Sequence, residues 1–92
     1  MEPTFKLATH SDIDTLLRLM PEFYEHERLQ FDERTRSALE QLLGDKALGQ
    51  VWLICDGDEA IGYVVLALGF SLEYHGRDAF VDEFYVQASH RG

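Results

Sequence analysis

The sequence predicts an α+β fold: a mainly antiparallel sheet of about four strands with two helices on one face, in the order β-α-α-β-β-β. Three observations lead to this class. Apolar residues recur at helical spacing in two segments of the first half. The second half is rich in β-branched and aromatic residues, and the tight-turn signal DGDE at 56–59 separates two of its strand-like runs. The 92 residues suit a single domain, 1–92.

The first two predicted elements are a short strand and an amphipathic helix. Residues 4–8 alternate apolar and polar side chains, which is typical of a strand. The helix is expected over about 12–28, because one apolar face repeats at helical spacing through Ile13, Leu16, Leu17, Met20, Phe23 and Tyr24. Pro21 has no amide hydrogen to donate, so we expect a kink or a break near Met20.

A second helix is predicted over 32–43, with Asp32 as its N-cap and Gly44 as its stop signal. Two strands should follow at 51–55 and 60–70, joined as a hairpin. Residues 60–70 are apolar on both alternating sets, which predicts a strand buried on both faces of the sheet.

The last predicted strand is 79–86, after a loop over 71–78 that bends at Gly76. The two helices suffice to cover one face of such a sheet. A strand that is apolar on both sides needs cover on both, and these residues offer no obvious cover for the second face. We therefore expect part of the fold to be missing from the chain.

The net charge is −9, from 17 acidic against 8 basic residues, which argues against a nucleic-acid partner because such proteins present a basic face. An acidic chain is better suited to cations, such as amines or basic peptides. The single cysteine, Cys55, and the lack of a signal peptide indicate a cytoplasmic protein, and no apolar run is long enough to span a membrane. The scattered histidines do not have metal-binding spacing, so no metal site is predicted.

Two stretches carry a family resemblance. The segments DGDEAIGYVVLAL at 56–68 and FVDEFYVQASHRG at 80–92, together with the order of the elements, resemble the N-terminal half of GNAT-superfamily N-acetyltransferases. Arg91 and Gly92 match the first two positions of that family's pyrophosphate-binding motif. The resemblance implies transfer of an acetyl group from acetyl-CoA to an amine, and it implies that the chain is an N-terminal part, truncated where the cofactor loop begins.

The resemblance also assigns roles along the last strand. The backbone of Phe84, Tyr85 and Val86 would engage the acetyl carbonyl and pantetheine of acetyl-CoA, and Arg91 and Gly92 would begin the diphosphate grip. Glu83 would be the general base, directly or through water. Adjacent strand residues point to opposite faces, so at most one of Glu83 and its neighbour Asp82 is expected to face a given site. The alternative is that both acids are solvated or form cross-strand charge pairs.

For the acceptor, the resemblance points to the stretches 23–31 and 71–78, and its layout is similar to the diamine and polyamine branch of the family. Glu25, Glu27, Glu73 and Tyr74 would form an acidic, aromatic-lined entrance for a small cationic amine. The alternative for the stretch EHER at 25–28 is the solvated face of a helix end.

The isolated chain is expected to bind acetyl-CoA weakly or not at all. Losing three or four charge-assisted hydrogen bonds to the diphosphate, at about 1.5–3 kcal/mol each, removes about 5–10 kcal/mol. A micromolar ligand has only about −8 kcal/mol in total. Two other functions remain open: a non-catalytic interaction module that forms homodimers through the exposed sheet, because an uncovered edge strand recruits another chain, or a small α+β domain unrelated to the family.

Overall fold

A computed structural model describes residues 2–91. The order of elements is the predicted one, β-α-α-β-β-β. The elements are β1 (Thr4–Leu7), the 3₁₀ turn η1 (His10–Asp12), α1 (Ile13–His26), α2 (Glu33–Gly44), β2 (Gly49–Asp56), β3 (Glu59–Ser71), β4 (Gly76–Val86) and the 3₁₀ turn η2 (Ala88–His90).

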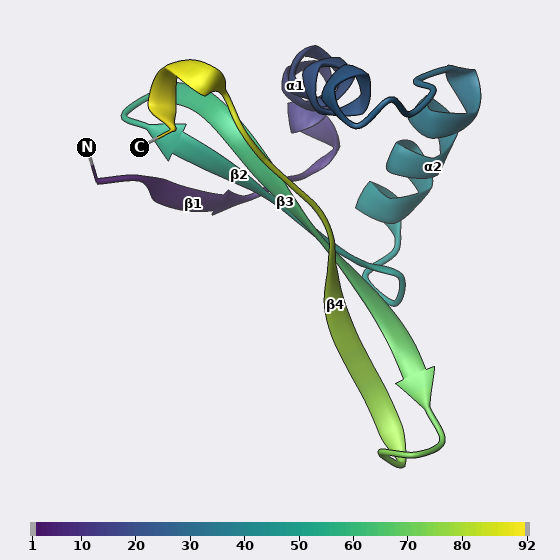
Figure 1. Ribbon diagram of the computed structural model, residues 1–92. Coiled ribbons are helices and arrows are strands. Elements are labelled where there is room, and N and C mark those ends of the chain that lie inside the picture. The colour runs from purple at the N-terminus through teal and green to yellow at the C-terminus, as the bar shows by residue number, and fades with distance from the viewer. Residues whose placement is uncertain (1, 92) are drawn as a thin grey trace.

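The sheet has four strands in the order β1-β2-β3-β4, and every neighbouring pair is antiparallel. Figure 1 shows α1 and α2 on the same side of this sheet, which confirms the predicted layers. Neither helix lies on the other face, which we call the outer face. It carries Phe5, Trp52 and Val64, which line a shallow apolar hollow. Phe84, next to Val64 in the register of β3 and β4, is 58% exposed.

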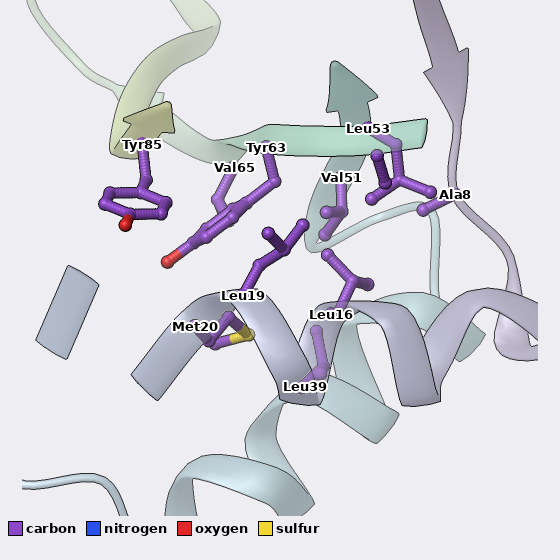
Figure 2. Packing of buried hydrophobic residues seen from close by; sticks show 11 residues of the cluster. Ala8, Leu16, Leu19, Met20, Leu39, Val51, Leu53, Tyr63, Val65 and Tyr85 are labelled. Atoms are coloured by element: carbon purple, nitrogen blue, oxygen red, sulfur yellow. The ribbon is translucent and has the colours of Figure 1, made fainter. Parts of the chain in front are cut away.

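The core lies between the helices and the inner face of the sheet (Figure 2). Leu16 and Leu19 of α1 are fully buried, and α2 contributes Leu39. The sheet supplies every second residue, as alternation requires: Val51, Leu53, Tyr63, Val65 and Tyr85. This packing, more than helix propensity, holds the two short helices in place.

Of the two outcomes predicted near Met20, a kink or a break, the break is wrong. α1 continues from Ile13 to His26 with Pro21 inside it. A proline in a helix interior costs about 3 kcal/mol, but the residues that precede it, Leu19 and Met20, are buried against the sheet. Burying each such side chain stabilises the fold by about 1.5–3 kcal/mol, which is sufficient to keep the helix continuous.

The predicted cap of the second helix is confirmed. The Asp32 carboxylate accepts hydrogen bonds from the backbone N–H groups of Arg34, at 3.0 Å, and Thr35, at 3.4 Å. The helix itself begins at Glu33 and includes Gly44, so the stop lies one residue later than predicted.

The expectation that β3 is buried on both faces is met only in its first half. Tyr63 is 0% exposed, whereas Phe70, on the same strand, is 70% exposed. The reason is that β2 pairs with β3 only as far as Ala67, so the end of the hairpin lies beyond the rest of the sheet. We call residues 69–78 the arm; Figure 1 shows it projecting away from the helices.

The bend of the arm also differs from the prediction. β3 ends at Ser71 and β4 begins at Gly76, so the turn is Leu72–His75 and Gly76 is the first residue of a strand. The positive φ that the turn requires, 62°, is taken by His75 rather than by the glycine.

Candidate functional site

The site is built around a β-bulge in β4. Val65 pairs with Glu83 and the next residue of β3, Leu66, pairs with Val81, so Asp82 has no partner on β3. A bulge of this kind inserts one extra residue, bends the strand and redirects its side chains.

Glu83 accepts two hydrogen bonds from phenol groups. The Tyr24 hydroxyl of α1 donates to Oε2 at 2.5 Å, and the Tyr63 hydroxyl of β3 donates to Oε1 at 2.8 Å. Burial, and then the neighbouring Glu83 carboxylate, raise the pKa of both tyrosines well above the usual value. Both phenols therefore remain protonated and act as donors across the physiological pH range.

Glu83 and Asp82 line the same pocket, between α1, α2 and β4. The pocket measures about 170 Å³, and its other lining residues are mostly apolar: Met20, Tyr24, Thr35, Ala38, Leu39, Leu42 and Val65. The expectation that at most one of the two acids can face a given site is therefore wrong. It assumed regular alternation, which the bulge interrupts at Asp82.

A second cleft, of about 520 Å³, lies between the C-terminal half of α1, the end of β4 and η2. It is lined by Phe23, His26, Glu27, Phe84, Tyr85, Val86, His90 and Arg91. The four described residues that the sequence nominated for cofactor binding, Phe84, Tyr85, Val86 and Arg91, are thus together in one cleft. Gly92, the fifth, lies outside the described residues.

Arg91 and Tyr85 make specific contacts in this cleft. The Arg91 guanidinium lies 5.2 Å from the centre of the Tyr85 ring, and its Nε–H donates to the Val86 carbonyl at 2.6 Å. The Tyr85 hydroxyl donates to Glu22 of α1 at 2.5 Å. Burial and then this carboxylate raise the pKa of Tyr85. The end of β4 is therefore tied to α1 on one side and to the chain after the strand on the other.

β4 is the edge strand of the described sheet. The Gln87 N–H donates to the Ile61 carbonyl of β3 at 2.7 Å, so it points into the sheet. Backbone groups alternate along an antiparallel strand, which directs the Tyr85 N–H toward β3 and the Phe84 and Val86 N–H groups toward the free edge. The backbone donors nominated from the sequence are thus available at Phe84 and Val86.

The four predicted acceptor residues are not brought together. Glu27 lines the larger cleft, while Glu25 is exposed on α1 and lines neither site. Glu73 and Tyr74 are in the turn of the arm. Ser71, at the base of that turn, is nine residues along β3 from Gly62, the partner of Val86. At about 3.3 Å per residue this is a separation of roughly 30 Å.

Sequence reasoning missed Tyr24 and Tyr63 as partners of Glu83. One signal existed for Tyr63: a tyrosine in a buried strand needs a partner for its hydroxyl. Which residue would supply that partner depends on how β3 and β4 are registered, and register is not visible in the composition of either strand.

Two further searches cover residues 2–91. No group of three or more histidine, cysteine, aspartate or glutamate residues in this range is arranged to hold a metal ion. Within the same range, neither helix has the length and the apolar composition needed to cross a membrane.

The chain was compared with family models, with curated proteins and with solved structures. No protein-family model and no curated protein matches the chain. Solved structures do match. An integron cassette protein from the mobile metagenome of Cole Harbour Salt Marsh is 43% identical, with a TM-score of 0.89 over 96% of this chain and 59% of its own.

Two other solved structures have names that state an activity. A "probable acetyltransferase" is 25% identical, with a TM-score of 0.78 over 99% of this chain and 60% of its own. A GNAT family acetyltransferase from Staphylococcus aureus subsp. aureus USA300_TCH1516 is 15% identical, with a TM-score of 0.74 over 99% of this chain and 67% of its own. The chain spans about 60% of the length of the first of these neighbours. Over its described length, the chain has the GNAT acetyltransferase fold, of which it forms the N-terminal part.

Proposed function

We propose that this chain contributes the N-terminal part of an acetyl-CoA-dependent N-acyltransferase in which Glu83 is the general base. One observation carries the proposal: β4 separates two hollows of different chemistry. On the inner side is the small pocket with the Glu83 and Asp82 carboxylates. At the free edge is the larger cleft with the outward N–H groups of Phe84 and Val86.

This arrangement suits acyl transfer to an amine. Acetyl-CoA supplies the thioester whose carbonyl carbon is attacked and whose C–S bond breaks. An amine held near the carboxylates loses its proton to Glu83, directly or through water, and becomes nucleophilic. The edge N–H groups of β4 are donors of the kind that stabilise an oxyanion.

For acetyl-CoA, the residues at the end of β4 are compatible with binding. Arg91 is a cation beside the exposed ring of Phe84 and the outward N–H of Val86. Residues 2–91 alone are expected to bind acetyl-CoA weakly, because a diphosphate is usually gripped by several backbone N–H groups at a helix N-terminus, and within the described residues no α-helix follows β4. For the acceptor, Asp82 joins Glu83 as an acidic group of the small pocket that suits a cationic amine.

The test uses a graft. Residues 2–91 replace the matching segment of a solved neighbour that binds acetyl-CoA in a calorimetric titration, and the same titration is repeated on the graft and on the 92-residue chain alone. We expect micromolar binding by the graft, no heat from the chain alone up to millimolar ligand, and CoA release from the graft with a panel of small amines. In the graft, Glu83→Gln should lower kcat at least 100-fold, while Glu59→Gln, at the start of β3, should not. A folded graft that binds no acetyl-CoA would overturn the proposal.

A second candidate, a homodimeric interaction module, is favoured by the outer face of the sheet. Phe5, Phe84 and Val81 are each more than half exposed there, and β4 presents a free edge. Exposed apolar surface next to an unpaired strand promotes pairing with another copy. Sedimentation at tens of micromolar tests it: a dimer that is lost in the Phe84→Lys variant supports the candidate, and a monomer at all concentrations rejects it.

A further inference from the structure

Glu83 is part of a hydrogen-bonded group of three side chains. Its two carboxylate oxygens are each hydrogen-bonded by a different tyrosine, Oε2 by Tyr24 and Oε1 by Tyr63. These donors come from different elements, α1 and β3, while Glu83 itself is on β4. The carboxylate therefore joins three elements at the wall of the small pocket.

Neither phenol is free to turn away. Tyr63 is 0% exposed, and its ring packs edge-on against Phe23 at 6.2 Å and beside Tyr85 at the same centroid distance. The Tyr24 ring is held edge-on between Phe23, at 5.8 Å, and Phe31, at 5.3 Å. Figure 2 shows Tyr63 and Tyr85 extending from the sheet toward α1. Aromatic packing thus fixes both donors before any ligand enters.

We propose that Tyr24 and Tyr63 are positioning residues for Glu83: each holds one carboxylate oxygen, so that the charge of Glu83 is fixed at the pocket wall. This inference rests on the proposed function for its catalytic meaning. A general base must lie within hydrogen-bond reach of the proton that it takes, and small displacements of such groups are costly in rate. Two locked donors remove the rotamer freedom that a glutamate on an edge strand would otherwise have.

The surrounding charges are consistent with this role. Asp82 from the bulge adds negative charge near Tyr24, and Tyr85, whose hydroxyl donates to Glu22, packs beside Tyr63. Burial and then the Glu83 carboxylate raise the pKa of both phenols, and Asp82 raises that of Tyr24 further, so the tyrosines donate and do not compete with Glu83 for the acceptor's proton.

The first test is made on the chain itself and does not depend on catalysis. Tyrosinate formation is followed by absorbance near 295 nm as the pH is raised, with circular dichroism reporting the fold. In Glu83→Gln, the ionisation of Tyr24 should begin at a lower pH than in the unmodified chain, because a charged acceptor has been removed while the burial of the phenol remains. Tyr24→Phe in the same background should abolish that early phase.

Glu59→Gln is the matched control, because it removes one exposed carboxylate on β3 while both phenols donate to Glu83. Its titration should superimpose on that of the unmodified chain. If the Glu83→Gln titration also superimposes while the fold is retained, the paired hydrogen bonds do not exist and the inference fails.

The second test uses the graft. Tyr24→Phe and Tyr63→Phe should each lower kcat at least tenfold and leave the KM for acetyl-CoA within about twofold, and the pH profile of kcat should change, since a purely structural role would not alter it. If the graft is active and both variants keep the parent kcat, the positioning role is wrong although the proposed function stands. If the folded graft is inactive throughout, the proposed function fails, and the absorbance titration still decides whether the tyrosines hold Glu83.

Discussion

The same two strands, β3 and β4, behave differently at their two ends. Near Gly62 and Val86 they lie under α1, with Tyr63 fully buried and Tyr85 only 7% exposed. Past the bulge at Asp82 the strands remain paired as far as Ser71 and Gly76, but Leu72 in the turn of the arm is 85% exposed. Strand pairing therefore does not imply uniform stability, because packing against the helices differs along the two strands.

The largest expected loss of stability comes from a substitution where β3 and β4 pack against α1. Tyr63→Ala should lower the free energy of unfolding by about 3–5 kcal/mol, since it removes a buried aromatic ring and leaves Glu83 with one donor fewer. Urea unfolding followed by circular dichroism measures this. Phe70→Ala in the arm is the control and should change the value by less than about 0.5 kcal/mol. Equal losses in the two variants would contradict the comparison.

A smaller loss of stability is expected when Gly62 is replaced by alanine, and Gly76 is the control. A Cβ on Gly62 would lie 2.1 Å from the Tyr85 carbonyl oxygen, whereas a Cβ on Gly76 would meet no atom within 4 Å. Gly62→Ala should therefore cost about 1–3 kcal/mol, because the paired backbone must move apart. Gly76→Ala should be close to neutral. Thermal unfolding of the two variants side by side would show whether the close approach is confined to the packed end.

The next prediction concerns the hydrogen bonds of the Asp12 carboxylate, at the start of α1. It accepts from the Thr9 N–H and from Lys6, both at 3.0 Å. Burial opposes its charged form, but these donors outweigh that cost and hold the pKa of Asp12 below the usual value. Its contribution, about 1 kcal/mol for a capping group, is present above the unfolded-state pKa and is lost as the pH falls through the lower folded pKa. Asp12→Asn should thus be less stable at pH 7, and the difference should shrink below about pH 4.

The smallest effect is expected at the tip of the arm. Leu72→Ser should leave the free energy of unfolding within about 0.5 kcal/mol of the unmodified chain, because the side chain contacts little. Amide hydrogen exchange sharpens the point: protection should fall along β3 from Tyr63 toward Ser71. Uniform protection along the strand would show that the arm is packed against a partner in solution.

The sequence predicted the elements well because their signals are local. The cap at Asp32, the order of strands and the two-helix layer follow from periodicity and turn chemistry. The expectation that residues 60–70 are buried on both faces failed in the arm, since it depended on where β2 stops pairing, and that is set by the length of a different segment.

The site was predicted only in part, because its geometry depends on segments that are distant in the sequence. The cofactor residues nominated on β4, Phe84, Tyr85 and Val86, line one cleft. Glu73 and Tyr74 were assigned to the acceptor entrance by the family resemblance of the stretch 71–78, and the length of the hairpin places them far away. The bulge at Asp82 was invisible, because a single unpaired residue leaves no periodic signal in an eleven-residue strand.

That bulge makes β4 one residue longer than its pairing with β3 requires. Before the bulge, the side chains of even-numbered residues such as Phe80 are on the face of the sheet that carries the helices. After the bulge, the side chains of odd-numbered residues such as Tyr85 are on that face. A change in chain length is therefore tolerated very unequally along the strand. Deleting Asp82 would restore regular alternation and leave every other pair in register, whereas deleting one residue elsewhere between Gly76 and Val86 would turn part of the strand inside out. Among the residues of β4, Asp82 is therefore the one that can be deleted while the other cross-strand pairs stay in register. Its deletion would remove one carboxylate from the pocket.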